Sequence, residues 1–217
     1  MKVKRRELIT GGLAAGALCA VPARAGAQAL TQAFDLAFAR PSSNTPYERR
    51  LGEIARRERD RAGSKLWRKD IVGIADYARP SSLPRLHFVN MDSGKVRSFL
   101  VAHGKGSDPE HDGWLKHFSN YPGSEATSRG SYLTCEWYNG KYGTSIRLVG
   151  LDADNSTALN RAIVMHGAAY VDAAMIEKFG KIGRSQGCFA MAPADFNEAL
   201  WHLSGGRLLY ADRIGMV

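Results

Sequence analysis

The feature that most limits the possible fold is a series of short apolar runs, five to eight residues each, separated by turn residues. The runs are rich in Val, Ile, Phe, Tyr and Leu and are bounded by Pro, Gly, Asn or Ser, a pattern typical of β-strands. They lie at residues 70–77, 86–91, 96–103, 131–138, 145–149 and 162–166. Short strands at this spacing indicate a sandwich or a partly closed barrel, not a parallel sheet with helical crossovers.

Helices are expected on either side of these strands. Thr45-Pro46 is a helix start, and the helix should end at Gly63. Its apolar positions fall on one face and are Tyr47, Leu51, Ile54, Ala55 and Ala62. We interpret it as a helix packed on the edge of the domain, with a partner-binding helix as the alternative. Two more helices are predicted over residues 156–161 and 193–203, and a hairpin turn over residues 92–95.

The fold class is therefore mainly β with flanking helices (α+β). We expect an N-terminal helical extension over residues 30–64 and one domain over residues 65–217, which is long enough for a single core.

Residues 1–29 are predicted to be an export signal. Basic residues at its start are followed by an apolar, small-residue-rich stretch and by Ala-x-Ala cleavage sequences. Lys4-Arg5-Arg6-Glu7-Leu8-Ile9 resembles the twin-arginine signal. Glycines interrupt the apolar stretch, which favours a cleaved signal over a retained anchor. The mature protein is thus expected in the periplasm or cell envelope, with no stable membrane span.

Once this signal is removed, the net charge and the number of cysteines exclude few classes of function. The whole chain has a net charge of +9, whereas residues 30–217 hold 25 basic and 20 acidic residues, a net charge of +5. No nucleic-acid-binding motif is recognisable. Two cysteines remain, Cys135 and Cys188; they could pair in an oxidising compartment, and we favour unpaired thiols.

The candidate active-site stretch is residues 165–191. It contains His166-Gly167 and, further on, Ser185-Gln186-Gly187-Cys188. A cysteine reacts as thiolate, so it needs a neighbouring base or positive charge, and His166 could supply the base. Gly187 permits a tight turn that aims backbone N–H groups at an oxyanion. The alternative is a buried structural cysteine beside a structural histidine.

Residues 163–191 resemble the active-site segment of the murein L,D-transpeptidases (the YkuD-like catalytic domain), in which a His-Gly pair is followed by Ser/Thr-His-Gly-Cys. The chain is most similar to the branch whose segment reads Gly-Arg-Ser-x-Gly-Cys. Residues 72–77, 101–107, 140–143 and 161–167 also resemble that branch in order and spacing.

This resemblance implies a peptidoglycan L,D-transpeptidase that uses no cofactor and acts on stem peptides. Cys188 would attack the peptide bond after a meso-diaminopimelate-type residue, and His166 would take its proton. The carbonyl of Gly167 would orient the imidazole, and the N–H groups of Gly187 and Cys188 would receive the oxyanion. The thioester would pass to an amine, giving a cross-link, or to water, giving an L,D-carboxypeptidase.

Two departures from the family motif stand out. Gln186 replaces a second histidine, and Ala190 replaces an arginine that usually holds the stem-peptide carboxylate. Arg184 could take that role, because a guanidinium suits a carboxylate. Tyr170, Ser185 and Gln186 are further candidates for contacting substrate. The departures also leave open a wall-binding protein whose catalytic machinery has decayed.

Two other interpretations compete for the same region. Residues 183–187 satisfy the Gly-x-Ser-x-Gly nucleophile elbow, but its α/β-hydrolase context is missing. His103, His111 and His117 lie in or beside a long polar loop, yet their spacing matches no common metal-binding pattern, so we expect no metal site. We interpret the loop as flanking the substrate.

Overall fold

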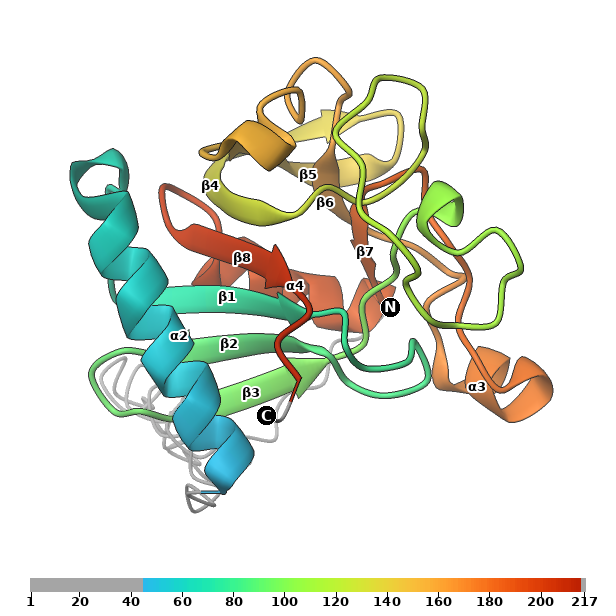
Figure 1. Cartoon of the computed structure of the whole chain (residues 1–217), viewed down its shortest axis with the longest axis horizontal. Coiled ribbons are helices and arrows are strands. Elements are labelled where there is room, and N and C mark those ends of the chain that lie inside the picture. Colours follow the sequence, from blue (N-terminus) through green and yellow to red (C-terminus); the bar gives the residue numbers. More distant parts are fainter. Residues whose placement is uncertain (1–44, 216–217) are drawn as a thin grey trace, which may run out of the picture. The chain divides into compact units, whose positions relative to one another are not determined.

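The computed structural model describes residues 45–215, and both the predicted export signal and residues 30–44 of the predicted helical extension lie outside them. Eight strands form one mixed sheet in the order β3-β2-β1-β8-β4-β5-β6-β7, with β3 and β7 at its two open edges (Figure 1). The strands are β1 Ile71–Asp76, β2 Leu86–Asn90, β3 Val96–Phe99, β4 Gly130–Gly140, β5 Gly143–Gly150, β6 Val164–Gly167, β7 Phe189–Met191 and β8 Leu208–Asp212. The prediction of a mainly β fold with flanking helices is confirmed.

Strand β8 joins the two halves of the sheet. It pairs in parallel with β1 (Val72 opposite Leu208) and antiparallel with β4 (Tyr132 opposite Leu209). The three strands β1 to β3 form an antiparallel meander, with the predicted turn between β2 and β3. On the other side, β4, β5 and β6 are antiparallel neighbours, and β7 pairs in parallel with β6. The candidate active-site stretch thus belongs to the β6–β7 edge.

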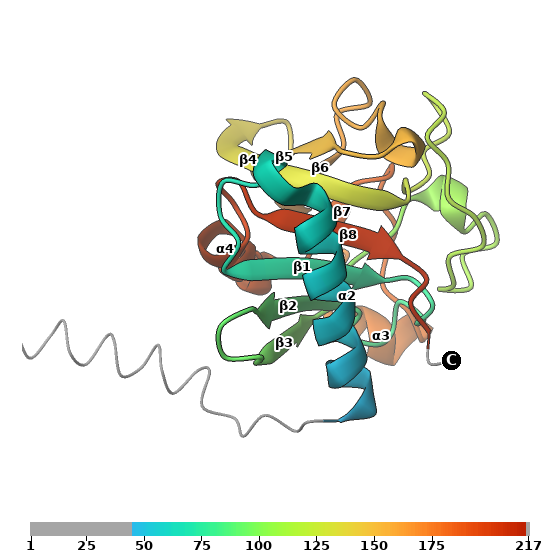
Figure 2. The ribbon, with the colours of Figure 1, turned by 60° about the vertical axis from the view of Figure 1, so that its left-hand side comes forward.

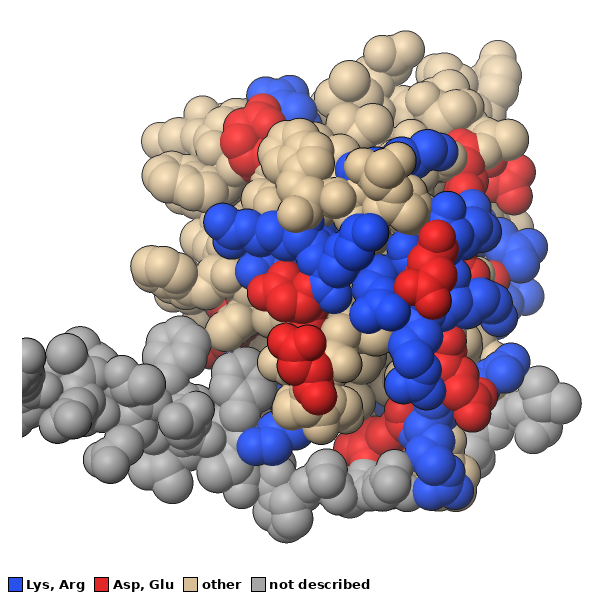
Figure 3. Space-filling view, turned by 90° about the vertical axis from the view of Figure 1, so that its left-hand side faces the viewer, with Lys and Arg blue, Asp and Glu red and all other residues tan. Residues whose placement is uncertain are grey.

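Helix α2 (Pro46–Ala62) begins and ends where the sequence predicts. Thr45 and Glu48 form a reciprocal capping box that satisfies two otherwise unpaired N–H groups, and such caps stabilise a helix by about 1 kcal/mol. The apolar face of α2 packs across β1, β2 and β8 (Figures 1 and 2). The helix is therefore part of the core. The face that carries α2 is rich in Lys and Arg (Figure 3).

The remaining helices agree only in part with the sequence. Helix α4 (Pro193–His202) is confirmed, and α3 (Ala173–Phe179) was not predicted. The predicted helix over residues 156–161 is wrong: a 3-10 turn over Ala153–Asn155 is followed by further turns. Asn155 explains this, because its side-chain oxygen accepts from the Asp152 backbone N–H and its amide donates to the Ser131 carbonyl, which favours a turn over a helix.

The sheet is covered on both faces. One cluster of buried side chains includes Phe88, Met165 and Phe189, and the other lies under α2 and includes Leu51 and Ile74. Every residue of β1 is buried as a result, so this strand shows no alternation of polar and apolar residues. Within residues 45–215, none of the helices has the length and hydropathy that a bilayer span requires.

Candidate active site

The sheet brings His166 and Cys188 to one face at neighbouring positions. His166 lies in β6 opposite Ala190 of the parallel strand β7, and Cys188 immediately precedes β7. Side chains alternate along a strand, so Cys188 shares the face of Ala190 and of His166. Both side chains are nearly buried, with 3% of His166 and 6% of Cys188 exposed. Cys188 therefore lies on the same face as His166, one residue before β7 and two residues before Ala190, the residue opposite His166.

The orientation of the His166 ring follows from its hydrogen bond. Nδ1 lies 3.0 Å from the carbonyl oxygen of Gly167, which can only accept, so Nδ1 carries the proton. In the neutral ring, Nε2 is then left with a lone pair. Burial lowers the pKa of His166, and the bond to Gly167 offsets part of that effect. His166 is therefore a neutral base at neutral pH, with Nε2 as its accepting atom.

Tyr142 covers the His166 ring. It lies in the tight turn between β4 and β5, and its ring stacks on the imidazole with centroids 4.7 Å apart and planes 18° apart. Tyr142 is 42% exposed, so the hairpin tip lies over the site while remaining open to solvent.

The Cys188 thiol is protonated in the resting structure. Sγ lies 3.7 Å from the carbonyl oxygen of Ala162 and donates to it. Burial raises the pKa of the Cys188 thiol, while the backbone N–H of Val164 and the charge of Arg161 lower it to a smaller extent. The resting pair is a neutral thiol and a neutral imidazole, not a thiolate–imidazolium ion pair.

The turn before Cys188 depends on Gly187 and Ser185. Gly187 has φ 110°, and a Cβ there would lie 2.7 Å from the carbonyl oxygen of Ala126, so a side chain is excluded. The buried Ser185 hydroxyl donates to the Cys188 carbonyl (2.7 Å) and accepts from the Gly187 N–H (3.1 Å). Ser185 thus stabilises the turn, which disfavours it as the nucleophile of a hydrolase elbow. The Gly187 N–H is occupied in this resting state.

Two other candidate residues are Tyr170 and Gln186. Burial raises the pKa of Tyr170 to about 12, and the charge of Cys188 adds to this shift. Gln186 donates to Glu125 (2.7 Å), which also pairs with Lys105 (2.8 Å).

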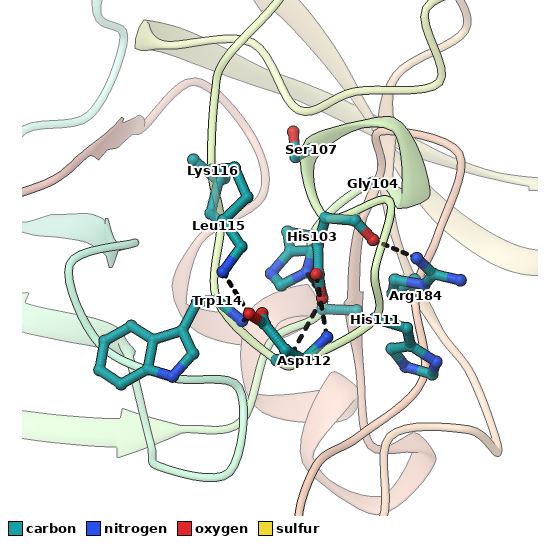
Figure 4. Close-up of polar contacts among 12 residues, drawn as sticks. His103, Gly104, Ser107, His111, Asp112, Trp114, Leu115, Lys116 and Arg184 are labelled. Carbon is teal, nitrogen blue, oxygen red and sulfur yellow. Dashed lines mark hydrogen bonds and ion pairs between the residues drawn. The ribbon is translucent and has the colours of Figure 1, made fainter.

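The Arg184 side chain lies against the loop that follows residue 103 (Figure 4). Its guanidinium donates to the carbonyl oxygens of Asp108 and Pro109. In this structure the partners of Arg184 are backbone carbonyls, and its binding of a substrate carboxylate stays a prediction.

A buried network anchors that loop. His103 lies between Arg85, which donates to Nδ1 (2.8 Å), and Asp108, which accepts from Nε2 (3.1 Å). Burial and the nearby Arg85 lower the pKa of His103 to about 3, so it is a neutral bridge between two charges. The His103 carbonyl in turn accepts from the Ser185 N–H. The network therefore supports the segment that leads to Cys188.

The remaining histidines do not form a metal site. His111 lies 3.2 Å from the Ile182 carbonyl oxygen through Nε2. Among the residues that the structure describes, no group of three or more His, Cys, Asp or Glu side chains is arranged to hold a metal ion. Cys135 and Cys188 are both free thiols, as favoured from the sequence.

A cavity of about 310 Å³ lies beside the turn that precedes Cys188. Its lining includes Glu125, Asn160, Arg161 and Gln186. Sequence reasoning missed Arg161, Ala162 and Tyr142 as site residues. All three lie in stretches that resemble the transpeptidase branch, so the signal was present at the level of segments but not of individual residues.

Comparison with known proteins gives one sequence-level match. The family model of the L,D-transpeptidase catalytic domain matches residues 50–211. No curated protein matches the chain in sequence.

Several solved structures are similar to the chain at low identity. An L,D-transpeptidase from Mycobacterium smegmatis is 13% identical with a TM-score of 0.41, covering 66% of this chain and 58% of that one. An L,D-transpeptidase from Xylanimonas cellulosilytica is 16% identical with a TM-score of 0.38, covering 65% and 60%. A helical cell shape determining protein from Campylobacter jejuni is 12% identical with a TM-score of 0.42, covering 75% and 56%. Each match spans less than two thirds of the solved chain.

Proposed function

Because the chain belongs to the L,D-transpeptidase catalytic-domain family, we propose that it is a cysteine acyltransferase that acts on peptidoglycan stem peptides. The observation that supports this chemistry most directly is the parallel pairing of β6 with β7, which puts His166 and the residue just before β7, Cys188, on one face of the sheet. The Gly167 carbonyl holds the imidazole in the tautomer that a general base requires.

In the first half of the reaction, the Cys188 sulfur attacks the carbonyl carbon of the peptide bond that follows a diaminopimelate-type residue. Nε2 of His166 takes the thiol proton as the S–C bond forms. The C–N bond then breaks, and the imidazolium returns the proton to the leaving amine of the terminal D-residue. Because thiol and imidazole are both neutral at rest, the proton moves during attack and not before it.

In the second half, an acceptor attacks the thioester while Nε2 of His166 takes its proton. The sulfur leaves and is reprotonated, which restores the resting state. An amine from a neighbouring stem gives a cross-link, and water gives a shortened stem peptide, so one thioester serves a transpeptidase and an L,D-carboxypeptidase alike.

The oxyanion of each tetrahedral intermediate is assigned to the N–H groups of Cys188 and Gly187. Gly187 donates to the Ser185 hydroxyl at rest, so its N–H has to be shared with or transferred to the oxyanion. We assign contacts with the stem peptide to Tyr142, whose ring stacks on His166, and to Tyr170. Arg184 would have to leave the Asp108 carbonyl to bind a substrate carboxylate.

We propose further that the enzyme is exported. In this scheme residues 1–29 form a twin-arginine-type signal, residues 30–64 a helical extension and residues 65–217 the catalytic domain, and the mature enzyme works in the periplasm or cell envelope.

The test is mass spectrometry of purified protein incubated with a disaccharide-tetrapeptide muropeptide. The proposal expects a thioester on Cys188 and loss of one terminal residue from the donor, with Cys188→Ala inactive. A cross-linked dimer identifies a transpeptidase, and tripeptide alone identifies a carboxypeptidase. An enzyme that forms no adduct and leaves the muropeptide intact would be a wall-binding protein, which contradicts the proposal.

A further inference from the structure

Arg161 has an unusual set of partners. Its Nη1 donates to the Ser119 carbonyl (2.9 Å) and to the Ser128 hydroxyl (2.6 Å). Its Nη2 donates to the Ala126 carbonyl (2.5 Å) and to the Ser124 hydroxyl (3.3 Å). These bonds hold the guanidinium in one place, and all four acceptors are neutral oxygens.

No carboxylate compensates this charge. Among residues 45–215, the ion pairs include no partner for Arg161, although most other arginines have one. The side chain is only half-exposed, and partial burial lowers the pKa of its guanidinium. A desolvated charge without a counter-charge is costly, so such a site favours an anion that is present only during function.

The fixed charge lies against the nucleophile turn. Nη2 of Arg161 is 3.2 Å from the position that a Cβ on Gly187 would occupy, one residue before Cys188. The next residue, Ala162, provides the carbonyl that accepts from the thiol. Ala162 has φ 53°, a backbone conformation that costs energy for a residue other than glycine and is found preferentially at functional sites.

We propose that Arg161 is the counter-charge of the Cys188 thiolate. The Arg161–Ala162 segment then stabilises the sulfur both as the protonated thiol and as the thiolate. The Ala162 carbonyl accepts from the thiol at rest. The guanidinium favours the thiolate once the proton has left. Arg161 lies in the segment that leads into β6, outside the Ser-x-Gly-Cys motif.

The other titratable groups that face the sulfur carry no positive charge at neutral pH. They are His166 on β6, Tyr170 in the segment after it and Tyr77 just after β1. Arg161 is thus the cation that bears on the thiol among these groups. The inference takes Cys188 as the reacting group, as in the proposed function, but it concerns the free enzyme and is testable without substrate.

The experiment is the pH dependence of alkylation by iodoacetamide, with each cysteine quantified separately by mass spectrometry of the full chain. In Arg161→Gln, the apparent pKa of Cys188 is expected to rise by about one unit, so its alkylation at pH 7 slows about tenfold. Arg161→Lys keeps the charge and is expected to restore most of the rate. Cys135 is an internal reference whose profile stays unchanged.

Two controls separate charge from loop support. Ser128→Ala removes an anchor of Arg161 but keeps the charge, and it is expected to leave the Cys188 profile near that of the wild type. Arg50→Gln removes one positive charge from the exposed Arg50–Glu53 pair on α2 and should have the same lack of effect on both cysteines. An unchanged profile in Arg161→Gln, or an equal shift in Ser128→Ala, overturns the inference.

A second comparison applies if Arg161→Gln does not fold. Cys188→Asp places a carboxylate at the sulfur position, and Cys188→Asn is its uncharged control. With Arg161 acting as counter-charge, the stability difference between the two variants stays constant from pH 5 to pH 8. If the carboxylate is merely buried, its folded-state pKa is raised and Cys188→Asp loses stability as pH rises, which overturns the inference. Neither measurement depends on turnover, so a failed muropeptide assay is distinguishable from a failure here.

Discussion

Two of the three buried histidines within residues 45–215, His103 and His166, have opposite hydrogen-bonding situations. His103 uses both ring nitrogens, one with Arg85 and one with Asp108. His166 uses only Nδ1, and within residues 45–215 no partner is bonded to its Nε2. Burial lowers the pKa of both, so burial and pKa direction do not distinguish them. The unused Nε2 of His166 does distinguish them, and it is the reason that we propose His166 as the histidine that exchanges a proton with Cys188.

The largest expected effect is a loss of turnover when His166 is replaced, because it alone of these two histidines has an unused ring nitrogen. In His166→Gln, turnover of muropeptide should fall on the order of 10³-fold, because general-base assistance of this kind contributes 10²- to 10⁴-fold. The melting temperature should fall only modestly, since the variant loses the bond to Gly167 and the stacking with Tyr142. The measurement is initial rates together with thermal unfolding. Retained turnover would mean that another group takes the Cys188 proton.

For the His103 network, we expect a substitution to lower the free energy of unfolding. Asp108→Ala removes the anion that faces a buried His103–Arg85 pair and also frees the N–H groups of Asp112 and Gly113. Breaking a buried charge network in this way costs about 3–5 kcal/mol. Urea unfolding of the variant measures the cost, and a loss below about 1 kcal/mol would show that Asp108 is not needed to anchor the loop.

A smaller effect concerns the cover over His166. In Tyr142→Ala, loss of the stacked ring removes about 0.5–1.5 kcal/mol of aromatic contact, which corresponds to a rate decrease of up to about tenfold. Tyr142→Phe keeps the ring and is the matched control. Equal losses in both variants would indicate that the hydroxyl matters and not the stacking.

The smallest expected effect is a displacement of the pH profile. Burial lowers the pKa of His166, so the neutral base persists to lower pH than an ordinary imidazole, and the acid limb of kcat/KM should have its midpoint below about 6.5. Folding stability should also fall at acid pH. Because the pKa of His166 is lower in the folded state than in the unfolded state, the folded protein loses stability as pH falls through the unfolded-state pKa. An acid limb above about 6.5 would contradict a buried neutral His166.

Sequence reasoning located α2, α4 and six strands because each has a local signal, such as the Thr45–Glu48 cap or the turn at residues 92–95. It missed β7 and β8. The first has only three residues, and the second is fully supported by distant partners, β1 and β4. Local pattern carries no information about such pairing.

The candidate site likewise contains some residues that the sequence identifies and others that only the structure reveals. His166 and Cys188 were found from residue chemistry and a family motif, but their juxtaposition depends on the parallel pairing of β6 with β7. Arg161 was missed, since an arginine becomes informative only when its four neutral acceptors and the missing carboxylate are visible. Its neighbour Ala162 gives no sequence signal for a positive φ, because alanine rarely adopts one.

The position of β8 between β1 and β4 has a consequence for folding kinetics. Val72 pairs with Leu208, so the sheet closes its central gap through a contact between residues more than a hundred positions apart. Such non-local pairing slows folding, because loop closure precedes the stabilising contacts. Until β8 docks, β1 and β4 both present unpaired edges that can recruit another chain. The most vulnerable moment of this molecule is therefore the interval in which the α2 half and the active-site half have formed without the strand that joins them.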